Sequence, residues 1–184
     1  MKERIFYSIG VNPCLELINN HPSSIECVFF SSKFKNKPKY FEFLNIIEGK
    51  LNYKIDDEFI RSISDKENSD VIITFKEYKQ IFNNNKTLII ENETDVGSIG
   101  TIIRTAVAFD YKQILIVTRN DFDIFDSYLI RASMGAIFMC NVATIKDINE
   151  YTIKDIDLYI KKDKDLTLPF QIKVAQILYK ESIK

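Results

Sequence analysis

The strongest constraint on the fold is a strand–helix–strand pattern between residues 86 and 118. Residues 86–91 and 113–118 are short, β-rich apolar runs of the kind found in buried strands. Between them, apolar side chains recur at helical spacing and share one face: Ile99, Ile102, Ile103, Ala106 and Phe109. Two strands joined by a helix form a parallel βαβ unit, so the pattern predicts an α/β protein with a parallel sheet.

Glycine marks two stretches in and after this unit. Three of the five glycines fall within residues 95–106 and 131–138, and in a chain so poor in glycine each indicates a positive φ angle or a close backbone approach. Ser98 is the predicted N-cap of a helix that runs to about Phe109. Free backbone N–H groups at such a helix start, with the guanidinium of Arg104 nearby, suit an anionic ligand or a phosphate.

Two strings of residues within these stretches carry a resemblance. The first is Gly100-x-x-x-Arg104-Thr105-Ala106-x-Ala108-Phe109, and the second is Arg131-Ala132-Ser133-Met134-Gly135-Ala136-x-Phe138. In this order, on these elements and at this separation, they resemble the motifs of the SpoU (TrmH) family of RNA 2′-O-ribose methyltransferases, which belong to the knotted SPOUT class. A lone G-x-x-x-R carries no weight, whereas the two strings together are specific.

The resemblance implies a SPOUT-like Rossmannoid domain with a parallel sheet at residues 86–184. It implies S-adenosylmethionine as the methyl donor and RNA, either tRNA or rRNA, as the substrate. It also implies that Arg104 contacts the acceptor ribose or phosphate and assists removal of the 2′-hydroxyl proton, with Ser98 and Arg131 as further RNA-binding residues. Members of the family are generally dimers with the acceptor site between subunits, so a homodimer is expected.

The chain departs from the family pattern after residue 138. There the family supplies a Gly-x-Glu loop, an Ile-Pro loop and a Ser-Leu-Asn helix start, which tie the trefoil knot and bind the donor. In this chain no glycine follows Gly135, no Gly-x-Glu string is present, and a stretch rich in Lys and Asp occupies residues 161–165. Ser98 also stands where the family usually has Asn. We therefore expect an incomplete knot and a truncated, degenerate donor site.

Residues 1–80 are predicted to form a small α/β domain of the L30e-like type, which would serve as an RNA substrate-binding extension. Gly10, Val11, Leu15 and Glu16 are similar to the start of the extension that many SpoU proteins carry. Residues 76–85, which end in three asparagines, are predicted to be a linker.

Lysine alternates with other residues in one short segment, in the order Lys33, Phe34, Lys35, Asn36, Lys37, Pro38, Lys39 and Tyr40. Cations that contact phosphate and rings that stack on bases would make this an RNA-contacting loop, with Lys33, Lys35 and Lys37 as RNA-binding residues. The alternative is a solvated lysine-rich loop, which is the commoner role of a charge run.

The net charge and the cysteine spacing limit which kinds of partner and which cellular location can be expected. The formal net charge is −1, so there is no global basic field and RNA binding must come from local patches. Cys14, Cys27 and Cys140 are scattered and lack C-x-x-C spacing, which favours reduced thiols and a cytoplasmic location and argues against zinc. No apolar run is long enough to span a bilayer, so no membrane association is expected.

Metal sites find little support in the sequence. The single histidine, His21, excludes a multi-histidine site. Asp121, Asp123 and Asp126 form a carboxylate cluster, but their spacing favours turn and N-cap roles over a metal loop.

Three functions remain open from the sequence. The first is a divergent SpoU-type RNA 2′-O-methyltransferase, whose catalytic competence the missing donor loops leave open. The second is a non-catalytic RNA-binding or ribosome-assembly remnant of that family. The third is a Rossmann-like domain used only as an interaction module.

Overall fold

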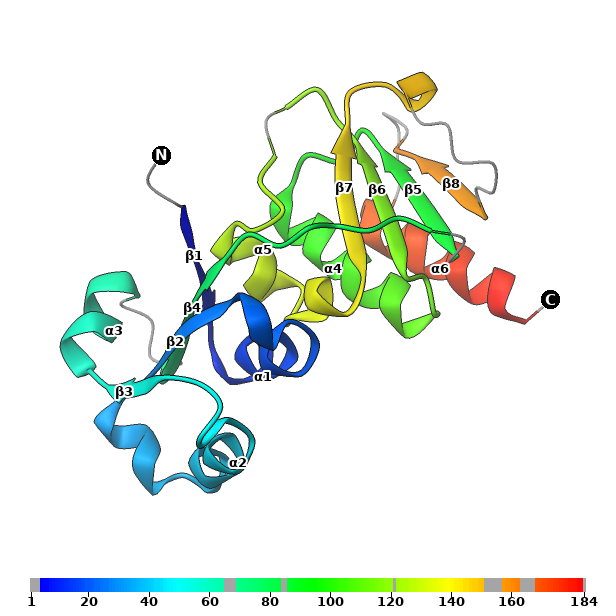
Figure 1. Cartoon of the computed structure of the whole chain (residues 1–184). Coiled ribbons are helices and arrows are strands. Elements are labelled where there is room, and N and C mark those ends of the chain that lie inside the picture. The colour runs from blue at the N-terminus through cyan, green and yellow to red at the C-terminus, as the bar shows by residue number, and fades with distance from the viewer. Residues whose placement is uncertain are drawn as a thin grey trace. The chain divides into compact units, whose positions relative to one another are not determined.

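Two four-stranded sheets organise the chain, one in each of two units (Figure 1). The units are Met1–Tyr78 and Lys79–Lys184. The structure is a computed structural model, and it describes residues 4–64, 69–83, 86–120, 122–150, 157–162 and 168–183. Asp121, two of the three linker asparagines and residues 163–165 of the Lys/Asp-rich stretch lie outside these ranges.

The first unit is a mixed sheet with short helices. Its elements in chain order are β1 (Ile5–Ile9), α1 (Val11–Asn20), η1 (Pro22–Ser24), β2 (Ile25–Phe30), η2 (Ser32–Asn36), α2 (Pro38–Ile47), β3 (Tyr53–Ile55), α3 (Asp57–Ile63) and β4 (Val71–Lys76). The strand order is β1-β4-β2-β3. Strand β4 runs antiparallel to both neighbours, and β3 runs parallel to β2.

An aromatic cluster forms part of the core of the first unit. The ring of Phe30 on β2 lies 5.8, 5.2 and 5.6 Å from the rings of Phe34, Tyr40 and Phe43, measured between centroids. Phe34 and Tyr40 are only 1% and 7% exposed. The hydrophobic effect therefore draws inward two of the rings that the sequence analysis offered for base stacking, and that interpretation of Phe34 and Tyr40 is wrong.

The second unit is built on a parallel sheet. Its elements are β5 (Thr87–Glu91), α4 (Val96–Ala108), β6 (Gln113–Val117), α5 (Ser127–Ala132), η3 (Ala136–Met139), β7 (Asn141–Ile145), η4 (Ile148–Glu150), β8 (Leu158–Lys161) and α6 (Phe170–Ser182). The strand order is β7-β6-β5-β8, and every pair is parallel. The predicted α/β class and its parallel sheet are confirmed.

Helix α4 covers one face of this sheet, and the predicted apolar stripe explains why. Ile99, Ile102, Ile103 and Ala106 are fully buried, whereas Phe109 lies beyond the helix end and is half-buried. Helices α5 and α6 both pack against α4 (Figure 1). All five residues of β6 are buried, as expected for a central parallel strand covered on both faces.

Residues 79–83 pack against the second unit, although the sequence predicted a linker there. The backbone N–H of Ile81 donates to Oδ1 of Asn141 at 3.0 Å, and Oε1 of Gln80 accepts from the N–H of Val142 at 2.9 Å. Phe82 packs against the apolar cluster of the sheet. The boundary between the two units, between Tyr78 and Lys79, lies inside the predicted linker, and these hydrogen bonds hold Gln80 and Ile81 to the edge strand β7.

Among the described residues, no helix combines the length and apolar character needed to cross a membrane.

Candidate functional site

The two motif stretches meet where α4 packs on α5, and glycine makes that contact close. A Cβ atom on Gly100 would lie 2.5 Å from the Cβ atom of Ala132 and 2.8 Å from its carbonyl carbon. Gly135, between α5 and η3, has a left-handed φ of 86°. Both glycines therefore have the backbone roles that the sequence predicted for them.

Asp95, and not Ser98, is the N-cap of α4. The Oδ1 atom of Asp95 accepts from the backbone N–H of Ser98 at 2.6 Å, and this hydrogen bond lowers the pKa of Asp95. The hydroxyl of Ser98 instead donates to Oε1 of Gln171 in α6 at 3.2 Å. The predicted cap at Ser98 is wrong because Asp caps a helix as well as Ser does, and the helix begins at Val96.

Two carboxylates occupy the helix start at which the sequence predicted free N–H groups. Glu93 is 1% exposed and accepts from the backbone N–H groups of Thr94 and Asp95 at 2.8 and 3.0 Å. It also pairs with Nζ of Lys162 at 3.0 Å. Part of the stabilisation that this helix start offers to an anion is thus used by the chain's own acids, which would compete with an anionic ligand there.

Arg104 and Arg131 lie on the two helices that meet at Gly100. Arg104 is exposed and comes one turn after Gly100 on α4, away from the buried isoleucine face. Arg131 is half-buried in the last turn of α5, next to Ala132. Within the part of the chain that the structure describes, no hydrogen bond or ion pair engages either guanidinium.

The three candidate lysines belong to the first unit and differ in their surroundings. Lys33 and Lys35 are exposed on η2. Lys37 follows η2, and its Nζ pairs with Oδ2 of Asp70 at 2.5 Å. An RNA phosphate would have to compete with that carboxylate, so the structure leaves Lys33 and Lys35 as the more available cations.

The acidic loop before α5 makes local hydrogen bonds. Oδ1 of Asp123 accepts from the N–H of Phe125 at 2.9 Å. Asp126 caps α5 by accepting from the N–H groups of Tyr128 and Leu129. The turn and N-cap interpretation is confirmed for these two aspartates. In the described ranges, no three His, Cys, Asp or Glu residues are grouped as metal ligands.

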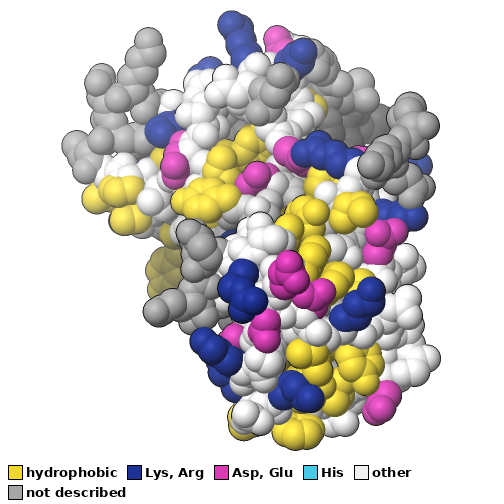
Figure 2. Space-filling view, turned by 90° about the vertical axis from the view of Figure 1, so that its left-hand side faces the viewer, with side chains coloured by type: hydrophobic (Ala, Val, Ile, Leu, Met, Phe, Trp, Pro, Cys, Tyr) yellow, Lys and Arg dark blue, Asp and Glu magenta, His cyan; other side chains and the backbone are white. Residues whose placement is uncertain are grey.

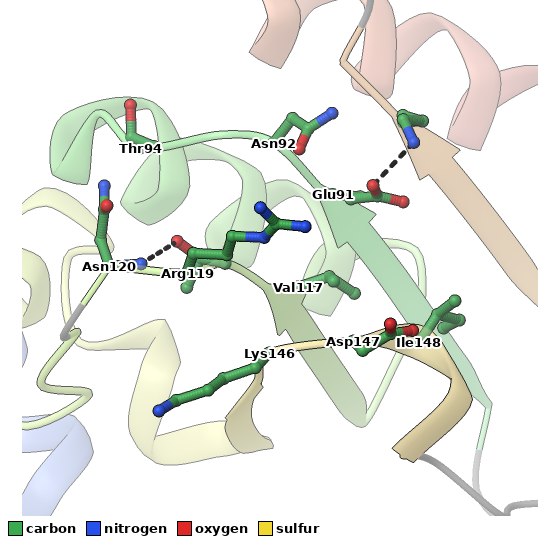
Figure 3. A pocket seen from close by; sticks show the side chains of 11 residues that line it. Glu91, Asn92, Thr94, Val117, Arg119, Asn120, Lys146, Asp147 and Ile148 are labelled. Carbon is green, nitrogen blue, oxygen red and sulfur yellow. Dashed lines mark hydrogen bonds and ion pairs between the residues drawn. The ribbon is translucent and has the colours of Figure 1, made fainter.

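A pocket that the sequence analysis missed lies at the carboxyl ends of the parallel strands. Its volume is about 460 Å³. Figure 3 shows its lining, which consists of Glu91, Asn92, Thr94, Val117, Thr118, Arg119, Asn120, Lys146, Asp147, Ile148 and Lys161. Ligands of open α/β sheets bind outside the carboxyl ends of the strands. The polar residues that directly follow Ile90, Val117 and Ile145 were therefore a signal that could have revealed it.

Charges in the pocket are partly paired. Glu91 pairs with Nζ of Lys161 at 2.7 Å and also accepts a hydrogen bond from the hydroxyl of Tyr159. The hydrogen bond from Lys161 and then that from Tyr159 lower the pKa of Glu91, whereas burial and, to a lesser extent, the negative charge of Asp147 raise it. Asn92 has a left-handed φ of 66°, a conformation that Asn tolerates better than most residues. The pocket thus offers amides, hydroxyls and both signs of charge.

The surface view shows basic side chains scattered among acidic ones, without a large basic surface on the face drawn in Figure 2. On the face shown in Figure 2, lysine and arginine side chains are interspersed with acidic ones and do not merge into one basic surface. RNA contact on that face would therefore depend on individual cations.

Comparison with known proteins identifies related sequences and folds. Residues 85–165 match the family model described as the SpoU rRNA Methylase family. No curated protein matches the sequence. The SpoU methyltransferase AviRb from Streptomyces viridochromogenes, solved in complex with AdoMet, is similar with a TM-score of 0.75 at 12% identity, covering 97% of this chain and 89% of that chain.

Two further solved structures are similar. An AdoMet-bound rRNA methyltransferase from Sinorhizobium meliloti has a TM-score of 0.67 at 16% identity, covering 96% of this chain and 86% of that chain. An RNA 2′-O ribose methyltransferase has a TM-score of 0.69 at 11% identity, covering 98% of this chain and 88% of that chain. At such identities the likeness establishes the fold, and it extends over both units.

Proposed function

We propose, because residues 85–165 match the model of the SpoU rRNA Methylase family, that the chain is an S-adenosylmethionine-dependent 2′-O-ribose methyltransferase that acts on tRNA or rRNA. The observation that carries the proposal is the packing of the two motif stretches on each other, with Gly100 against Ala132. This contact brings Arg104 and Arg131 onto two helices that pack on each other.

The pocket fits the donor in size and chemistry. Its volume of about 460 Å³ is in the range of small-molecule sites. Asn92, Asn120 and Thr118 can hydrogen-bond a nucleoside, while Val117 and Ile148 can contact its base. S-adenosylmethionine would supply an activated methyl group. Similar structures of the fold, AviRb and the Sinorhizobium meliloti enzyme, were solved with AdoMet.

Arg104 is the proposed catalytic residue. A guanidinium stays protonated at all physiological pH values, so Arg104 would bind the acceptor ribose or phosphate and stabilise negative charge as the 2′-hydroxyl loses its proton. Its exposed position, without a partner in the described ranges, leaves it available to RNA. Arg131 and Ser98 would add RNA contacts, although Ser98 would first give up its bond to Gln171.

The first unit is the proposed RNA substrate-binding extension. Lys33 and Lys35 would contact phosphates as point charges, and Lys37 would do so in competition with Asp70. We further propose a homodimer and a cytoplasmic location; the three free cysteines, of which Cys14 and Cys140 are buried, support the latter.

A second candidate function rests on the start of α4. The ion pair between Lys162 and Glu93 ties the end of β8 to the chain before α4. If that arrangement prevents donor binding, the chain is a non-catalytic RNA-binding or ribosome-assembly remnant of the family.

Binding and transfer measurements separate the two candidates. The first measurement is calorimetric titration of the purified chain with S-adenosylmethionine up to millimolar concentration. The second is transfer of a labelled methyl group to bulk RNA. Arg104→Ala is expected to keep donor affinity and to lower transfer by about 100-fold or more, because it removes a group that acts on the reacting hydroxyl.

Lys112→Ala is the matched control, since Lys112 precedes β6 at the opposite end of the sheet and pairs with the nearby Asp110 at 3.5 Å. Retention of transfer by Arg104→Ala would contradict the catalytic assignment. Failure of the wild-type chain to bind the donor would favour the non-catalytic candidate.

A further inference from the structure

Among the side chains that line the pocket, Arg119 offers the most hydrogen-bond donors to a ligand. It lies two residues after the end of β6, is exposed, and extends over the strand ends toward the side of the pocket formed by β5 (Figure 3). In the described part of the chain, its guanidinium makes no hydrogen bond or ion pair. A guanidinium offers five donors in a rigid fork that matches a carboxylate.

The other cations of the pocket are less suited to a ligand. Lys161 is paired with Glu91 at 2.7 Å. Lys146 points away from Asp147 and toward the outer side of the pocket (Figure 3). Arg119 is therefore the cation best placed to meet a ligand inside the pocket.

The acids of the pocket restrict the class of ligand. Glu91 and Asp147 line it together with the three cations, and Asp147 already accepts from the N–H and side-chain amide of Asn149 at 2.9 and 2.8 Å. Because Glu91 is paired with Lys161 and Asp147 adds a second carboxylate beside the other two cations, the lining suits a ligand that carries both signs of charge. An amino acid group, with its carboxylate and ammonium, has that character.

We propose that Arg119 is a specificity-determining residue that binds the carboxylate of the methionyl group of S-adenosylmethionine in a bidentate manner. The proposal rests on the proposed function, because it assigns the donor to this pocket. It predicts that the pocket recognises the amino acid end of the donor through a side chain.

The test compares two ligands and several variants. Wild type, Arg119→Gln and Arg119→Lys are titrated by calorimetry with S-adenosylmethionine and with 5′-methylthioadenosine, which has the nucleoside and sulfur but no carboxylate. Arg119→Gln is expected to bind S-adenosylmethionine about 10- to 100-fold more weakly, the usual effect of losing hydrogen bonds to a charged group. Its affinity for 5′-methylthioadenosine is expected to stay unchanged. Arg119→Lys keeps the positive charge but cannot make two parallel hydrogen bonds to a carboxylate, so its affinity for S-adenosylmethionine is expected to lie between those of wild type and Arg119→Gln.

Lys112→Gln is the control for a general loss of positive charge, and it is expected to bind both ligands as the wild type does. Circular dichroism confirms that each variant is folded. Equal affinity of wild type and Arg119→Gln for S-adenosylmethionine would overturn the proposal while leaving the proposed function intact. An equal loss of affinity for both ligands would overturn the proposal as well. Arg119 would then contact the nucleoside or support the folded pocket, and would not bind the carboxylate. If the wild type binds neither ligand, the proposed function fails and the inference fails with it.

Discussion

Single residues decide how closely the two motif stretches approach each other. Gly100 has no side chain, and its neighbours occupy the space that a Cβ atom would need. Gly97, three residues earlier, faces only the hydroxyl of Tyr128 at 3.3 Å and Oδ1 of Asp95 at 3.4 Å from an added Cβ atom. The two glycines of α4 therefore have different roles. Gly100 is required because the backbone of α5 lies against it, whereas the position of Gly97 has room for a larger residue.

The Gly100→Ala variant tests this requirement. The added methyl group would overlap the backbone of α5, which cannot move as a flexible side chain can. We expect the free energy of unfolding to fall by about 1–3 kcal/mol, as in other overpacked contacts. Urea denaturation measures the change. Gly97→Ala is the control and is expected to stay within about 0.5 kcal/mol of wild type, because the gain in helix propensity offsets a small shift of Tyr128. Equal stabilities of the two variants would contradict the close-contact interpretation.

At the scale of secondary structure elements, two adjacent lysines at the end of β8 form ion pairs with two glutamates at and just after the end of β5. Lys161 pairs with Glu91, which is 16% exposed, and Lys162 pairs with Glu93, which is 1% exposed. Glu93 also holds the two backbone N–H groups just before α4. The pair of Lys162 and Glu93 thus connects β8 to the start of the motif helix.

Substitution of Lys162 by Met is expected to destabilise the second unit. It leaves the carboxylate of Glu93 buried without its cation, although the lysine is 36% exposed and water can partly replace it. We expect a loss of about 1–2 kcal/mol, less than for a fully buried charge. Thermal or urea unfolding measures it. Lys161→Met breaks the more exposed pair and is expected to cost less than about 1 kcal/mol. A double-mutant cycle with Glu93→Gln should show coupling, and additivity would exclude the pair as the cause.

At the scale of the whole molecule, α6 carries apolar side chains on its exposed side as well as on its buried side. Phe170, Val174 and Leu178 are buried, but Ile172 and Tyr179 are 44% and 58% exposed. The helix is therefore apolar on two sides, while one packed face would suffice for a monomer. The proposed homodimer would cover the second side.

The oligomeric state gives a direct test of this arrangement. Light scattering coupled to gel filtration is expected to report the mass of two chains for the wild type and of one chain for Ile172→Asp, because a charge would be buried without a partner at the interface. Ile81→Asp is the matched control, since Ile81 is 61% exposed but lies outside α6. A monomeric wild type would contradict the proposed dimer, and equal effects of both variants would exclude α6 as the interface.

Local patterns in the sequence determined much of the second unit. Continuous apolar runs placed β5 and β6, and the helical spacing of apolar residues placed α4, within a few residues of their observed bounds, because burial on both faces of a strand and on one face of a helix imposes those patterns directly. The scarcity of glycine correctly marked Gly100 and Gly135 as positions with a backbone role. The two motif strings indicated the resemblance to the SpoU family, and the family model matches the residues that contain them. Each string is a short run of neighbouring residues, so it can be recognised without knowledge of the tertiary structure.

Only the tertiary structure decided what depends on contacts between distant segments. Lys162 reaches Glu93 across 69 positions, and hydrogen bonds to the side chains of Gln80 and Asn141 hold part of the predicted linker to β7. Phe34 and Tyr40 look like an RNA-stacking pair in sequence, yet the core around Phe30 buries them. The pocket likewise exists only because parallel pairing brings the ends of separate strands together. Periodicity reports which face of an element is buried, but not which distant side chain it meets there.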